Sequence, residues 1–137
     1  MNNLSLLSIC VTCRDNHDDI YEHRGEARLA RKVFDQLGTK KLVNIRGVQC
    51  MSNCKRACIL SLTSSKGFTY MFGDINPNKS EYVSSLRDLV AAYESKVDGF
   101  LHRRERPPLF RSNIVARVPP IDYVSPMIAK FKNEWIP

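Results

Sequence analysis

The chain has 137 residues, of which 43% are hydrophobic and 26% charged, and its formal net charge is +7. This is the size and composition of one ordinary folded domain, and no run of about 18 apolar residues exists that would predict a membrane span. A chain of this length can bury a core without disulfides, so its five cysteines need a chemical explanation.

The start of the sequence, MNNLSLLSIC, has no Lys or Arg ahead of its apolar run. That run, from Leu4 to Ile9, is also shorter than a secretion signal requires. We therefore expect a cytoplasmic protein. Because the cytosol is reducing, clustered thiols there bind metals or do redox work more often than they form structural bridges.

Hydrophobic periodicity predicts six elements in the first two thirds of the chain. Strands are expected over 4–9, 42–48, 59–62 and 68–72, and helices over 26–37 and 81–96. Ser80 is the expected N-cap of the second helix, and Ser64–Gly67 has the composition of a hairpin turn. The order β-α-β followed by β-β-α indicates an α/β domain.

Beyond residue 99 the composition changes. Residues 1–99 hold 14 Lys or Arg against 11 Asp or Glu, a balance of +3, whereas residues 100–137 hold 7 against 3, a balance of +4. The second segment also contains Arg103–Pro108 and Val118–Pro120, which break regular structure. We predict a metal-binding domain over 1–99 and a basic, irregular extension over 100–137 that packs on the domain or on a partner.

The basic extension favours docking to an acidic redox partner protein. Nucleic acid is disfavoured because no helix-turn-helix, zinc-finger or RNA-binding signature accompanies the charge. We also allow for a homodimer.

The cysteines form two groups. Cys10 and Cys13 have the spacing C-x2-C, and Cys50, Cys54 and Cys58 follow after 36 residues with the spacing C-x3-C-x3-C. Thiolates suit zinc and iron–sulfur clusters, which commonly take four of them. In a parallel β-α-β unit, Cys10 and Cys50 would each follow the C-terminal end of a strand, where ligands gather. We therefore predict a metal centre.

The segment Cys50-Met51-Ser52-Asn53-Cys54-Lys55-Arg56-Ala57-Cys58-Ile59 resembles the second cysteine segment of thioredoxin-like 2Fe–2S ferredoxins and of the small iron–sulfur subunit of respiratory complex I. The resemblance implies a thioredoxin-like fold with a mixed four-stranded sheet. It also implies that Cys50 and Cys54 bind one iron and that Cys10 and Cys13 bind the other. In this chain Ser52 replaces a glycine of those proteins, and Cys58 replaces a proline and is a substitute candidate for the fourth ligand.

The whole chain is also similar to a bacterial family of predicted metal-binding proteins of unknown function. Five segments carry this similarity: Cys10–Arg14, Cys50–Arg56, Tyr70–Asp74, Arg104–Pro107 and Ala116–Pro119. This resemblance implies metal binding and names no reaction.

The sequence predicts a small 2Fe–2S protein that carries single electrons or serves as an accessory protein, rather than an enzyme. Lys55 and Arg56 lie between candidate ligands, where positive charge would favour a reduced cluster. Two alternatives stay open: a structural zinc or other transition-metal site on the same cysteines, and a dithiol oxidoreductase that uses Cys10 and Cys13. His17, His23 and His102 are weaker ligand candidates.

Overall fold

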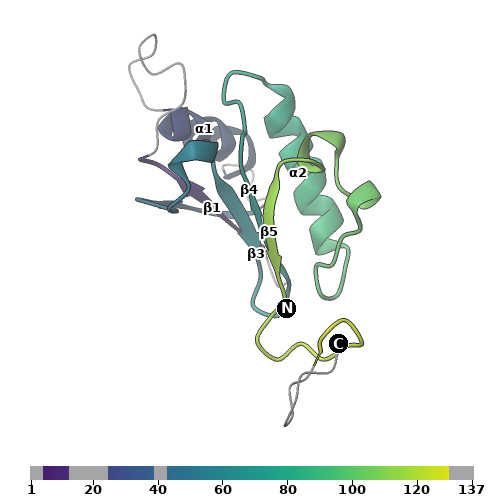
Figure 1. Ribbon diagram of the computed structural model, residues 1–137. Coiled ribbons are helices and arrows are strands. Elements are labelled where there is room, and N and C mark those ends of the chain that lie inside the picture. The colour runs from purple at the N-terminus through teal and green to yellow at the C-terminus, as the bar shows by residue number, and fades with distance from the viewer. Residues whose placement is uncertain (1–4, 13–24, 39–42, 130–137) are drawn as a thin grey trace.

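The computed structural model describes residues 5–12, 25–38 and 43–129. Within these residues, five strands form one mixed sheet in the order β2-β1-β3-β4-β5 (Figure 1). The strands are β1 (Leu6–Cys10), β2 (Asn44–Val48), β3 (Leu60–Thr63), β4 (Thr69–Phe72) and β5 (Ile114–Val118). β1 and β2 are parallel, and the other neighbouring pairs are antiparallel.

Two helices and the sheet share one buried core. The helix α1 (Gly25–Val33) continues as the π-helical turn η1 (Phe34–Gly38), and α2 (Glu81–Glu94) follows β4. Leu29 from α1 and Leu86 from α2 belong to the same buried cluster as Leu7 and Leu60 of the sheet. Because both helices pack their apolar stripes into this cluster, the predicted α/β class is confirmed.

The six elements predicted from periodicity are present, with bounds that differ by at most two residues when η1 is counted with α1. The predicted turn between β3 and β4 is closed by a hydrogen bond from the Gly67 amide to the Ser64 carbonyl, 3.3 Å long. Ser80 directly precedes α2, as predicted, but the expectation that its side chain caps the helix is wrong. Its backbone is already helical, at φ −60° and ψ −25°, and its side chain makes no capping hydrogen bond.

The predicted count of four strands is also wrong, because residues 114–118 of the expected irregular extension form β5. This strand pairs antiparallel with β4. Proline does not interrupt it, since Pro108 begins the 3-10 turn η4 (Pro108–Phe110) and Pro119 follows the strand directly. The division of the chain at residue 99 stays a prediction. Among the residues described, no helix is both long and apolar enough to cross a bilayer.

The extension also supplies core residues. Phe110 is fully buried, and its ring meets those of Phe72 and Tyr82 edge-on at centroid distances of 5.1 and 6.0 Å. We predict that Phe110→Ala lowers the free energy of unfolding by about 3–5 kcal/mol, because it removes a large ring from a closed core. Urea denaturation measures this loss.

The matched control is Phe34→Ala on η1, where the side chain is 54% exposed. Since less apolar area is lost there, its cost should be about 1 kcal/mol. Equal losses for the two variants would contradict the placement of Phe110 in the core.

Candidate metal centre

The first and second cysteine segments leave the sheet side by side. Cys10 lies opposite Val48 in the parallel register of β1 and β2. One residue on, the Val11 amide donates to the Val48 carbonyl at 2.9 Å, and the Thr12 hydroxyl then donates to the Gln49 carbonyl. The pairing therefore continues past both strand ends, up to the residues that directly precede Cys13 and Cys50.

Cys10 lies in a small apolar cluster that is separate from the main core. It is fully buried with Ile59, and partly buried Met51, Ala57 and Met71 pack against the pair. Its neighbour Ile9 belongs to the main core. Because side chains alternate along a strand, Cys10 faces the side of the sheet opposite the helices.

Cys50 and Cys54 lie on the cysteine link, which we define as residues 50–58. Both side chains are exposed, and the sulfur of Cys50 lies 3.9 Å from the Ser52 hydroxyl oxygen. Ser52 has φ +61°, in the left-handed region that favours glycine. Serine thus adopts here the backbone conformation for which glycine is best suited. Cys54 then begins the 3-10 turn η2 (Cys54–Arg56).

Cys58 and Cys10 lie in different apolar clusters. The Cys58 side chain is fully buried in the main core, on the helix side of the sheet, whereas Cys10 is in the second cluster. Its backbone exchanges two hydrogen bonds with Ile75, each 3.3 Å long, and the Ala57–Cys58 peptide bond is cis. The structure therefore separates Cys58 from the Cys10 side chain by the thickness of the sheet.

The charges of Lys55 and Arg56 have different surroundings. The Arg56 guanidinium donates to the Asp74 carboxylate from Nε at 2.9 Å and from Nη2 at 2.6 Å. The Asp74 amide donates in turn to the Arg56 carbonyl at 2.6 Å. Lys55 is exposed. Asp74 offsets the Arg56 charge and fastens the link to the end of β4, a role that sequence reasoning missed.

The structure does not by itself assemble the predicted centre. In the described part of the chain, no three His, Cys, Asp or Glu side chains converge closely enough to hold a metal ion. Cys13, His17 and His23 lie outside the described residues. His102 stands beside Phe100, with ring centroids 5.1 Å apart, near the β5 edge. The donor chemistry nevertheless fits a thiolate-bound metal, because the strand ends bring two cysteine segments together.

Comparison with known proteins agrees with this architecture. A solved structure, a thioredoxin-like [2Fe-2S] ferredoxin from Aquifex aeolicus, matches with a TM-score of 0.51 and 12% sequence identity. The match covers 89% of this chain and 99% of that chain. The chain thus has a thioredoxin-like fold, as the sequence resemblance predicted.

A family described as Protein of unknown function (DUF1636) matches residues 7–120. The chain belongs to this family, which confirms the predicted membership in a family of unknown function. Comparison with curated proteins finds no match.

The contact between the cysteine link and the end of β4 can be tested by substituting Gly73. A Cβ atom on Gly73 would lie 3.0 Å from the Arg56 carbonyl oxygen and 3.0 Å from Cδ1 of Ile59. Gly73→Ala should therefore displace the link and cost about 1–3 kcal/mol in a urea denaturation experiment.

Gly47→Ala is the matched control, because its Cβ would meet only the Val11 side chain, also at 3.0 Å. A side chain can turn aside where a backbone carbonyl cannot, so we expect a smaller loss at Gly47. Should Gly73→Ala be as stable as the native protein, the link would not be held against β4 as described.

Proposed function

We propose that this protein binds a 2Fe–2S cluster and acts as a one-electron carrier or cluster-bearing accessory protein, without a reaction of its own. The observation that carries the proposal is the hydrogen bond from Val11 to Val48, which continues the β1–β2 pairing to the edge of both cysteine segments. The thioredoxin-like fold, shared with a protein described as a [2Fe-2S] ferredoxin, supports the choice of cluster.

Cys10, Cys13, Cys50 and Cys54 would hold the cluster, which when bound accepts and releases one electron. Cys58 was the substitute candidate for the fourth ligand. We assign that position to Cys13 because the Cys58 side chain belongs to the main core, on the far side of the sheet from Cys10.

The side chains around these cysteines would create two environments. Cys10 is enclosed with Ile59, and this apolar contact would exclude water from one side of the centre. Cys50 and Cys54 are exposed, so the other side would face an electron donor or acceptor. Lys55 would favour the reduced, more negative state, while Asp74 limits the contribution of Arg56.

Two alternatives use the same cysteines. A zinc ion would take the four thiolates and serve a structural role without redox chemistry. A dithiol oxidoreductase would use Cys10 and Cys13, but Cys10 is fully buried and α1 begins only at Gly25. A thiol so far from a helix N-terminus gains little stabilisation of its thiolate, so this alternative has weaker support.

We further propose that the protein works in the cytoplasm and docks an acidic redox partner through its basic C-terminal region. The start of β5 lies at the same end of the sheet as the cysteine link, since Ile114 pairs with Phe72 and Phe72 with Leu60. Electron transfer and docking of the acidic partner would thus take place at the same end of the molecule. Raising the salt concentration should weaken the binding of this partner.

The proposal is tested by iron, sulfide and zinc analysis of the native protein and five Cys→Ser variants, all purified without air. The native protein should contain about two irons and two sulfides per chain. Cys10→Ser, Cys13→Ser, Cys50→Ser and Cys54→Ser should each lose most of the iron. Cys58→Ser should retain it, although a buried hydroxyl in the core lowers stability by about 1–3 kcal/mol.

Cys58→Ser is the matched control, because it makes the same chemical change outside the proposed ligand set. If the native protein contains one zinc and no sulfide, the result would contradict the iron–sulfur cluster and support the zinc alternative. Iron loss in Cys58→Ser together with iron retention in Cys13→Ser would contradict the ligand assignment.

A further inference from the structure

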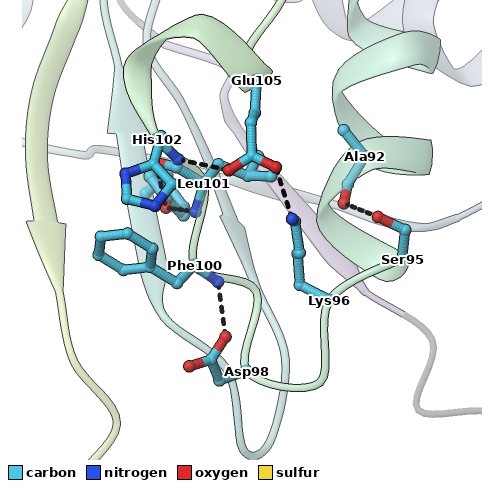
Figure 2. A network of polar contacts seen from close by, with 9 residues as sticks. Ala92, Ser95, Lys96, Asp98, Phe100, Leu101, His102 and Glu105 are labelled. Carbon is cyan, nitrogen blue, oxygen red and sulfur yellow. Dashed lines mark hydrogen bonds and ion pairs between the residues drawn. The ribbon is translucent and has the colours of Figure 1, made fainter. Parts of the chain in front are cut away.

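An arginine loop, defined here as residues 102–111, connects the C-terminal side of α2 to β5. It contains four arginines and one acidic residue, Glu105. Figure 2 shows that this acid is already engaged: one oxygen accepts from the His102 amide at 3.0 Å, and the other pairs with Lys96 at 2.5 Å. Glu105 therefore offsets a lysine outside the loop rather than the arginines within it.

The arginines are held by neutral groups. Arg106 donates from Nε to the Phe110 carbonyl at 2.8 Å and from Nη2 to the Arg111 carbonyl at 3.2 Å. Arg111 donates to the carbonyls of Arg106 and Arg104 at 2.9 and 3.1 Å. Arg103 donates to the Arg111 carbonyl at 3.2 Å. These carbonyls fix the geometry of the loop but leave its positive charge in place.

Three of the four arginines line an open cavity. His102, Arg103, Arg104 and Arg111 line a space of about 440 Å³. In the described part of the chain, the Arg104 guanidinium has no hydrogen-bond partner, and its side chain is exposed. All of its donors are therefore available to a ligand.

Arg106 lies behind this surface and is only 5% exposed. Burial lowers its pKa below the ordinary value; Tyr70 opposes this shift, and the nearby charges of Arg117, Arg103 and Arg111 add to it. Like charges are thus held close together by the fold, and a bound anion would relieve their repulsion.

We propose that this cavity binds the phosphoryl group of a small phosphate ester or diphosphate. Guanidinium groups match phosphate oxygens through paired hydrogen bonds, and a phosphoryl group carries more charge than one carboxylate. Arg103 and Arg111 are fixed before binding, so only the Arg104 side chain has to be ordered by the ligand. This site is independent of the metal centre and involves none of its cysteines.

Binding is tested by titrating the full chain with inorganic pyrophosphate in a calorimeter, with ionic strength held constant by KCl. The native protein should bind pyrophosphate. Arg104→Gln should weaken binding at least about tenfold, because charge-assisted hydrogen bonds are lost. Since the exposed Arg104 side chain makes no hydrogen bond or ion pair with the described residues, the variant should keep the native melting temperature.

Arg87→Gln is the matched control. It removes the same charge from an exposed position on α2, on the side that faces Leu37 and Val43. Native affinity in this variant would support a site in the arginine loop. If Arg87→Gln and Arg104→Gln weaken pyrophosphate binding equally, the affinity depends only on the net charge of the protein. That result would overturn the proposal.

Two further outcomes would also overturn it. If Arg104→Gln binds pyrophosphate like the native protein, the ligand lies elsewhere, for example on a bound metal. If the dicarboxylate succinate binds as tightly as pyrophosphate, the cavity recognises carboxylates, and an acidic protein surface would be the better occupant.

Discussion

The parallel pairing of β1 with β2 is the constraint on which the rest of this structure depends. The register from Leu6–Asn44 to Cys10–Val48 places Leu7 and Ile9 in the main core and Cys10 on the opposite side. A slip of one residue would reverse every side chain of β1, exposing its core residues and turning Cys10 toward the helices. The hydrophobic core thus fixes the position of the first proposed ligand.

Charged residues also lie at this end of the sheet. The Gly73 amide donates to the Asn113 carbonyl at 2.9 Å, and Asp74 binds Arg56 of the cysteine link. The link and the segment that enters β5 are therefore joined through the end of β4. This connection ties the cysteine link to the start of β5, the strand that directly follows the arginine loop. An anion bound in the loop would change the electrostatic potential that a docking partner meets.

Local patterns predicted the elements of the fold well, because the apolar spacing in α2 and the short apolar run of β1 match the buried positions of these elements. They missed β5 since neighbouring prolines and arginines suggested irregular structure, whereas pairing with β4 is a long-range contact. The cysteine groups were predicted as candidate ligands from spacing and resemblance. Their surroundings were not: the Asp74–Arg56 pair and the burial of Cys58 depend on how β3 and β4 meet. Ser52 has a left-handed backbone conformation. A glycine at this position would have indicated that conformation, whereas serine does not.

The central claim is that the two cysteine segments together hold a redox-active iron–sulfur cluster. The most direct measurement is the electron paramagnetic resonance spectrum of protein purified without air, recorded frozen before and after reduction with dithionite. We expect no signal from the oxidised protein and, after reduction, a signal of about one electron spin for every two irons. A protein with full zinc content that remains silent after reduction would contradict this claim.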